Sequence, residues 1–307
     1  MNPCSRTAPC KTFAGSISKT AAGGEISVLD PGGFGAITIT KSITIDGGKV
    51  AGLGSILAVG TNGIVINAAT TDVVTLRNLS INGAGTGIVG IRILAAGTVF
   101  IEDCQIFGFR AGTGSRGISD ERTTGGRLFV SNTVVRNNTA GGIVIVPVSG
   151  STRINASLEN VLVEGNGGGV SARTGSLVTI SNSVITGNDA FGLNAEEAAG
   201  NTEVNVEGCI ISQNDTGVLV RTGTPTVRLS NATIVNNTVG IQLTSGTMAT
   251  YVNNQIAAND SGNAAAPGRD DPPAIAFAAR TRGSPASTVL SESLGRCRGC
   301  RQGEGSR

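Results

Sequence analysis

One short phrase recurs along the chain and constrains its fold more than any other feature. It reads VTISNSVITGN at 178–188, and further copies are ASLENVLVEGN (156–166), VNVEGCIISQN (204–214) and VRLSNATIVNN (227–237). Weaker copies begin at Val74 and Val99. Self-similarity at a period of roughly 20–50 residues is the signature of a repeat architecture, in which neighbouring units bury a shared core.

The second apolar position of each copy sets the period, with spacings of 22 to 29 residues: Leu76, Ile101, Val130, Leu158, Ile180, Val206, Leu229 and Tyr251. Two residues further on stand Asn78, Asp103, Asn132, Asn160, Asn182, Gly208, Asn231 and Asn253. Asn, Asp and Gly are the residues that best tolerate a left-handed backbone. The pattern therefore predicts a bend with positive φ after each of these strands.

A second row of asparagines lies eight positions beyond the last six anchors: Asn138, Asn166, Asn188, Asn214, Asn237 and Asn259. A glycine and aliphatic residues follow, so each repeat contains three short alternating segments separated by turns, for example 192–195, 204–206 and 209–211. Asparagines aligned at one bend can hydrogen-bond from one turn of the chain to the next.

Three solenoid folds are candidates for this repeat pattern: the leucine-rich repeat, the left-handed β-helix and the right-handed β-helix. The segment LENVLVEGN (158–166) matches the leucine-rich template, but its fourth position is mostly small in the other copies and the second half of each repeat lacks helix formers. A left-handed β-helix needs regular hexapeptides, which the variable spacing excludes. We therefore predict an all-β fold, a single-stranded right-handed parallel β-helix with three sheets and about ten coils. Cys104 and Cys209 should be separate core thiols.

The predicted organisation has three parts: an N-terminal loop and capping helix (1–24), the β-helix (25–261), and a disordered or non-native tail rich in Arg and Pro (262–307). The tail carries seven arginines against four acidic residues, so the body is close to neutral. The body has no basic face and aromatics are 3% of the chain, so we expect no nucleic-acid partner. No apolar run is long enough to span a membrane.

Histidine is absent, which excludes Ser-His-Asp triads and His metal sites. Cys4 and Cys10 flank a Pro-containing loop and are either a disulfide or two free thiols. The CRGC motif (297–300) lacks the second cysteine pair that a metal site would need, so no metal is expected.

Residues 11–48, KTFAGSISKTAAGGEISVLDPGGFGAITITKSITIDGG, resemble the opening of right-handed β-helix proteins of the pectin-lyase-like superfamily. The resemblance extends over about 3–260 and implies a capping helix with Phe13, Ile17 and Ala21 on one face, ended by Gly23 and Gly24, before the first strands. It is greatest to exported bacterial members of unassigned activity. This implies a signal peptide upstream of Met1 and an extracellular or periplasmic location.

No catalytic motif of that superfamily can be mapped onto this chain. Its hydrolases pair aspartates with a Gly-His-Gly motif, and its lyases place an acidic calcium cluster beside a catalytic arginine. Calcium is therefore expected as a cofactor only if the chain is lyase-like, and the catalytic residues are unknown.

Two groups of charged residues are candidates for ligand binding. Arg173, Glu196 and Arg221 lie four positions beyond the glycine of three consecutive coils and should form a +/−/+ ladder. Such a ladder either binds an anionic sugar or carboxylate or is a set of surface ion pairs. Asp120, Glu121 and Arg122 lie in the longest polar insertion (119–127), which is either a binding segment or a solvated loop. Arg136 and Glu164 should pair on adjacent coils.

The functional hypothesis is an exported β-helix protein that binds a polysaccharide, a cell-surface glycan or another surface ligand through a lateral face. One alternative is a polysaccharide lyase or glycoside hydrolase with residues drawn from several coils. A second alternative is a structural or adhesive rod. The oligomeric state and the ligand are not determined by the sequence.

Overall fold

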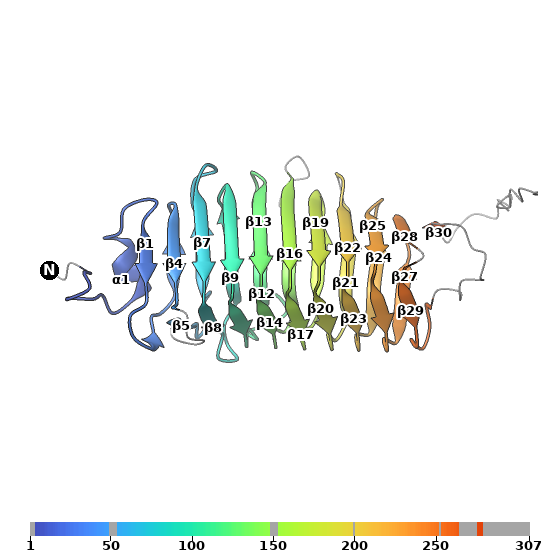
Figure 1. The fold of residues 1–307 in the computed structure, drawn as a ribbon, viewed down its shortest axis with the longest axis horizontal. Helices are drawn as coiled ribbons and strands as arrows, with labels where there is room; N and C mark the ends of the chain where they lie inside the picture. Colours follow the sequence, from blue (N-terminus) through green and yellow to red (C-terminus); the bar gives the residue numbers. More distant parts are fainter. Residues whose placement is uncertain are drawn as a thin grey trace, which may run out of the picture.

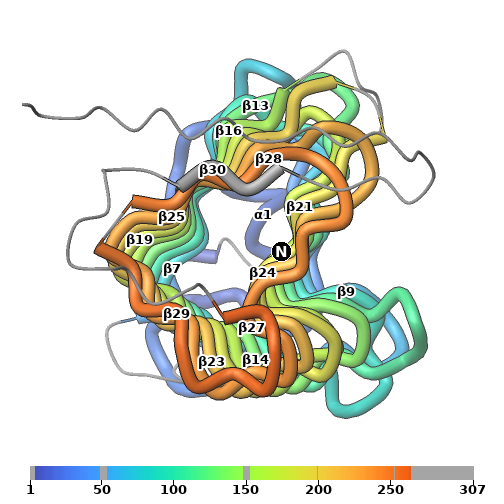
Figure 2. The backbone as a smooth tube through the Cα atoms, turned by 90° about the vertical axis from the view of Figure 1, so that its right-hand side faces the viewer, coloured from blue at the N-terminus to red at the C-terminus, as the bar shows by residue number. Residues whose placement is uncertain are grey.

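The protein is a long right-handed parallel β-helix whose turns stack along one axis (Figure 1). The computed structural model describes residues 4–48, 54–147, 153–198, 200–251, 253–263 and 275–278, the last as backbone alone. Viewed along the axis, the strands of each sheet lie one behind another (Figure 2). The short helix α1 (Phe13–Ile17) lies at the N-terminal end.

Each turn contributes one strand to each of three sheets. The first sheet contains β1 (Glu25–Ser27), β4 (Ile43–Asp46), β7 (Val73–Arg77), β10 (Thr98–Glu102), β13 (Gly126–Ser131), β16 (Ile154–Glu159), β19 (Ser176–Ser181), β22 (Glu203–Glu207), β25 (Thr226–Ser230), β28 (Thr247–Thr250) and β30 (Ile275–Ala278). The second contains β2 (Gly32–Gly33), β5 (Gly54–Leu57), β8 (Leu79–Asn82), β11 (Gln105–Phe107), β14 (Val134–Arg136), β17 (Leu162–Glu164), β20 (Val184–Thr186), β23 (Ile210–Ser212), β26 (Thr233–Val235) and β29 (Gln255–Ala257).

The third sheet contains β3 (Ile37–Ile39), β6 (Ile64–Asn67), β9 (Val89–Ala95), β12 (Arg116–Asp120), β15 (Gly141–Ile145), β18 (Val170–Arg173), β21 (Phe191–Glu196), β24 (Thr216–Arg221) and β27 (Val239–Leu243). The described residues thus form nine complete turns, matching the 9-stranded sheet, and two strands of a tenth. The predicted fold class is confirmed, with about nine turns instead of about ten.

The core is aliphatic and follows the alternation of the repeats. Val204 and Val206 of β22 are 0% and 2% exposed, whereas Asn205 and Glu207 between and after them are exposed. Cys104 and Cys209 are free buried thiols, as expected. Burial raises the pKa of Cys104 to about 12 and also raises that of Cys209, so both thiols stay protonated at neutral pH.

The predicted bends are present at seven of the eight positions, with φ near +50°: Asn78, Asp103, Asn132, Asn160, Asn182, Gly208 and Asn231. The eighth position, Asn253, follows a residue outside the described ranges. The row thus marks a backbone requirement, which explains why Gly and Asp replace Asn in it.

The second row of asparagines forms a buried hydrogen-bonded ladder. Asn166 Nδ2 donates to Asn188 Oδ1 at 3.1 Å, and its backbone N–H donates to the same oxygen at 3.0 Å. The same Nδ2 atom also donates to the carbonyl oxygen of Val135. The ladder continues to Asn259, which donates to Asn263 Oδ1 at 2.8 Å. The last bond of the ladder thus reaches residue 263.

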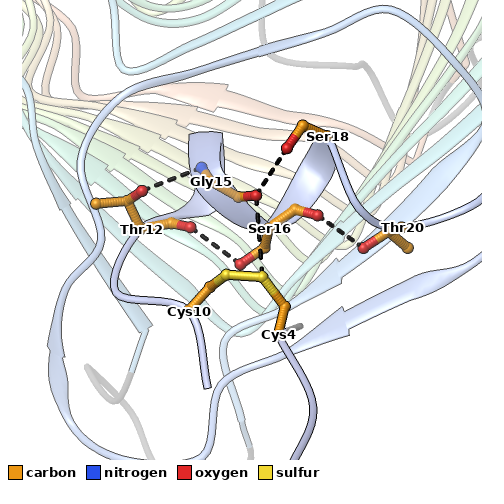
Figure 3. Close-up of a disulfide and its surroundings, with 7 residues drawn as sticks. All are labelled: Cys4, Cys10, Thr12, Gly15, Ser16, Ser18 and Thr20. Atoms are coloured by element: carbon orange, nitrogen blue, oxygen red, sulfur yellow. Dashed lines mark hydrogen bonds between the residues drawn. A yellow bond between two sulfur atoms is a disulfide. The ribbon is translucent and has the colours of Figure 1, made fainter. Parts of the chain in front are cut away.

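The N-terminal cap is shorter than predicted. Helix α1 ends at Ile17, so Ala21 does not belong to a helical face. The Thr12 hydroxyl caps the helix by accepting from the Gly15 N–H at 3.0 Å, while the hydroxyls of Ser16, Ser18 and Thr20 donate to backbone carbonyls one turn earlier (Figure 3). Such side-chain bonds compete with helix continuation.

A disulfide joins Cys4 and Cys10 and fixes the loop before α1 (Figure 3). Cys4 Sγ lies 4.0 Å from the carbonyl oxygen of Gly15, so the disulfide packs directly against the helix.

One short strand from the C-terminal segment lies among the described residues. Strand β30 pairs antiparallel with β28 through Ile275–Ala278 and so covers the edge of the last parallel strand of the first sheet. The CRGC motif lies outside the described residues.

A hydrogen-bonded carboxylate near the N-terminal end gives a pH-dependent prediction. The Ser42 hydroxyl donates to Asp72 Oδ1 at 2.7 Å and the Ala69 N–H donates to Oδ2 at 2.8 Å, and these bonds lower the Asp72 pKa. Because the pKa is lowered on folding, the bonds stabilise the protein above the ordinary carboxyl pKa of about 3.9 and this contribution is lost as the pH falls.

Ser42→Ala should raise the Asp72 pKa in an NMR titration. Ser27→Ala, whose hydroxyl bonds Glu25, is the control and should leave it unchanged; an unchanged pKa in Ser42→Ala would contradict the assignment.

Candidate anion-binding face

The outer surface of the third sheet carries most of the predicted ligand-binding residues. Along β18 and β21 the core residues Val170, Ala172, Leu193 and Ala195 alternate with residues that point away from the core. We call the outward group here the arginine face and define it as Arg92, Arg116, Glu121, Arg173, Glu196 and Arg221. It extends from β9 to β24, which are linked by consecutive parallel pairings.

The predicted +/−/+ ladder is present in the structure. Strand pairing places Arg173 beside Glu196 and Glu196 beside Arg221. Arg173 Nε lies 2.9 Å from Glu196 Oε1, and Arg221 Nη2 lies 3.1 Å from Glu196 Oε2. One carboxylate is therefore shared by two guanidinium groups from the turns on either side.

Glu121 forms a second such centre. Its Oε2 accepts from Arg92 Nη2 at 2.8 Å and Nε at 3.0 Å, and its Oε1 accepts from the Ser119 hydroxyl at 2.8 Å. Arg116 Nη1 lies 3.5 Å from Glu121 Oε1 and donates to Ser119 Oγ at 2.9 Å. Glu121 is thus also held between two arginines.

The charges of the arginine face do not balance, because four arginines surround two glutamates. Burial lowers the pKa of Arg116 below its ordinary value; the nearby Glu121 opposes this shift, while Arg173 and Arg92 act in the same direction as burial. The guanidinium group of Arg116 is therefore affected by positive charge from Arg92 in the Glu121 centre and from Arg173 in the Glu196 ladder. A further anion near these side chains would be stabilised by that surplus.

A polar floor lies beneath the arginines. Ser119, Ser171 and Asn194 point away from the core but are at most 1% exposed. Arg116 Nη1 binds Ser119 Oγ at 2.9 Å, and Arg173 Nε binds Ser171 Oγ at 3.1 Å. The long side chains therefore cover these small polar groups and are oriented by them.

Asp120 and Arg122 do not lie in a solvated loop, which was one of the two predicted alternatives for this segment. Asp120 is the last residue of β12, and both side chains are 0% exposed. Arg122 Nη2 donates to Asp120 Oδ2 at 2.6 Å and Nε donates to Oδ1 at 2.9 Å, while Nη1 donates to the Ala96 carbonyl at 3.0 Å. Burial raises the Asp120 pKa, and the bonds to Arg122 oppose that effect. This inward pair is separate from the arginine face, although Glu121 lies between its members in sequence.

Arg92 and Arg116 were missed by the sequence prediction, although a signal for them exists. Gly117 is followed four positions later by Glu121, the same offset that defines the ladder of Arg173, Glu196 and Arg221. Extending the glycine alignment two coils further toward the N-terminus, past Val146, would have placed Glu121 in this row, with Arg92 and Arg116 as its ion-pair partners.

The predicted pair of Arg136 and Glu164 and the neighbouring Glu197 do not belong to the arginine face. Arg136 Nη1 and Glu164 Oε1 are 3.9 Å apart on the second sheet, a loose exposed pair. Glu197 is 7% exposed and its Oε2 accepts from the Thr224 hydroxyl at 3.3 Å, so it turns away from the direction of Glu196.

The arginine face does not suit calcium. Calcium takes roughly six to eight oxygen ligands, mostly carboxylates and carbonyls. Glu121 and Glu196 lie on separate turns and each is already paired with two arginines. Within the described ranges, no three Asp, Glu, Cys or His side chains are grouped closely enough to hold a metal ion.

A surface hollow of about 530 Å³ lies at a different place, over the turns that carry the asparagine ladder. Its lining includes Asp189, Asp215 and Asp260, so its charge is unfavourable for an anionic ligand. In the part of the chain that the structure describes, no helix has the length and apolar character needed to cross a membrane.

Comparisons with known proteins agree with this architecture. A family model described as a right handed beta helix region matches residues 126–256. A crystal structure of pectate lyase Pel9A matches with a TM-score of 0.51 and 14% sequence identity, covering 85% of this chain and 77% of that chain. No curated protein sequence matches the chain. The chain thus has the right-handed parallel β-helix fold.

Proposed function

We propose that the protein is an exported binding protein that holds an anionic polysaccharide on its arginine face. The observation that carries this proposal is the grouping of four arginines around two glutamates on one side of the stacked turns. The surplus of guanidinium groups favours ligands with carboxylate or sulfate groups over neutral glycans.

The arginines retain donors for a ligand. A guanidinium group has five N–H donors. Arg173 contacts Glu196 and Ser171 through Nε alone, so within the described residues its two Nη groups donate to no protein acceptor. Its side chain is 32% exposed, and that of Arg221 is 42% exposed. Both side chains can therefore accept a ligand without losing Glu196.

The length of the face favours a polymer. Stacked turns are about 4.8 Å apart, so the face from β9 to β24 extends for roughly 24 Å along the axis. A linear chain lying parallel to the axis would contact several arginines at once, which raises its affinity relative to a single anionic sugar. The Cys4–Cys10 disulfide supports an oxidising, extracytosolic location.

A lyase or hydrolase is the second candidate, favoured by the likeness of the fold to a pectate lyase and by the two outward glutamates. Fold alone does not establish such an activity, because one fold hosts many functions. A structural or adhesive rod is the third candidate.

Size-exclusion chromatography after incubation with polysaccharides tests all three. We expect the protein to co-elute with pectate and not with neutral dextran, and we expect the pectate to keep its length. Co-elution should weaken as salt is raised from about 0.1 M to 1 M, because exposed charges are then screened. Shortened pectate would establish the enzyme instead. Equal behaviour toward pectate and dextran would contradict binding through the arginines and leave the rod.

A further inference from the structure

One amide on the polar floor lacks a partner. Asn194 lies between the core residues Leu193 and Ala195, so it points outward, and it is 0% exposed. Its Nδ2 donates to Ser171 Oγ at 3.0 Å, whereas its Oδ1 has no hydrogen-bond partner. The described residues include three buried atoms of this kind, and Asn194 is the one whose whole residue is buried.

The two sides of the Asn194 amide have different neighbours. In the orientation that the structure has, Nδ2 is the atom bonded to Ser171 and Oδ1 is the atom without a donor. On the other side, strand pairing places Leu219 next to Asn194, and its side chain can neither donate nor accept. A buried amide with one unpaired atom destabilises the fold by about 1–3 kcal/mol.

The asparagine ladder, by contrast, satisfies its buried amides. Asn166 Nδ2 donates both to Asn188 Oδ1 and to the Val135 carbonyl, and the ladder repeats this arrangement on successive turns. The exception, Asn194, pairs with Ser171, to which Arg173 donates, and lies two residues before Glu196 on the same strand. An unpaired polar atom at this position indicates a partner that the protein itself does not supply.

We propose that Asn194 is a specificity-determining residue: when Arg173 and Arg221 turn outward to hold the ligand's anionic group, the buried Oδ1 becomes accessible and accepts a hydrogen bond from a hydroxyl group of the ligand. This inference rests on the proposed function and narrows it. The ligand is a glycan that carries an anionic group and a free hydroxyl group near each other. An anionic polymer whose hydroxyls are blocked leaves Oδ1 buried and unpaired, and therefore binds less tightly.

Calorimetric titration with two probes, pectate and chemically O-acetylated pectate, tests this role. Wild-type protein should bind unmodified pectate about tenfold more tightly, the difference that one buried hydrogen bond produces. Asn194→Leu, which is similar in volume and forms no hydrogen bond, should lose about tenfold for unmodified pectate and should bind both probes equally. Asn194→Ala provides a second variant with the same expectation.

Stability separates this role from a structural one. Asn194→Leu removes an unpaired buried amide, so its melting temperature should equal or exceed that of wild type, whereas Asn214→Leu in the satisfied ladder should melt lower. An Asn194→Leu protein that binds pectate as tightly as wild type, or that still prefers the unmodified probe, would overturn the role of Asn194 alone. Failure of wild type to bind either probe would overturn the proposed function together with it.

Discussion

Val206→Asp should leave the protein unfolded at 25 °C, while Glu207→Lys should fold with nearly the wild-type melting temperature. Val206 is 2% exposed in the core of β22, where a carboxylate finds no partner, and an isolated buried charge costs several kcal/mol or more. That is a large part of a stability of about 5–15 kcal/mol. Glu207, one residue later, points to solvent. Its replacement by Lys removes the hydrogen bond that Asn231 donates to Glu207. Thermal melts by circular dichroism measure both effects.

The pair of variants tests the register of the stacked turns, since a shift by one residue would exchange the two positions. Equal tolerance of Val206→Asp and Glu207→Lys, or greater damage from Glu207→Lys, would contradict the register.

Arg122→Met should destabilise the protein by about 3–5 kcal/mol at pH 7, because it leaves the buried Asp120 carboxylate without its partner. Without Arg122, the Asp120 pKa rises further above its ordinary value. A folded-state pKa above the unfolded value favours the folded protein at low pH and loses that contribution as the pH rises. The deficit relative to wild type should therefore be smaller at pH 4 than at pH 7. Chemical denaturation at the two pH values measures it.

The double variant Asp120→Leu with Arg122→Met removes both charges and serves as the control. It should recover most of the stability lost in Arg122→Met, although the carbonyl of Ala96 loses its donor. An Arg122→Met protein as stable as wild type, or a double variant less stable than Arg122→Met, would show that the buried ion pair of Asp120 and Arg122 does not stabilise the fold.

The repeat was sufficient to predict the fold, the left-handed bends and the ladder through Glu196, because each depends on a residue type that recurs at a fixed position. The ladder at Arg173, Glu196 and Arg221 could be aligned because its three coils have clear glycine anchors.

Other features could not be predicted because they depend on the direction in which a side chain points and not on the residue type. The string SDERTTGGR is polar throughout, and polarity indicates solvent exposure, yet strand pairing turns Asp120 and Arg122 inward, where each satisfies the other. Helix α1 was predicted too long because hydroxyl side chains beyond Ile17 bond to the backbone. The unpaired amide of Asn194 has no sequence signature, because it results from what the neighbouring strands place beside it.

The measurement that tests the binding proposal most directly is the affinity for pectate of wild type and two charge-neutralised proteins at about 0.1 M salt. Arg173→Gln with Arg221→Gln removes two arginines from the arginine face. Arg228→Gln removes one from the first sheet, where Arg228 Nη1 donates to Glu203 at 2.7 Å, and is the matched control. We predict at least about a tenfold loss for the double variant, corresponding to about 1.4 kcal/mol, and an unchanged affinity for Arg228→Gln. Equal affinities in all three proteins, or an equal loss in both variants, would contradict binding at the arginine face.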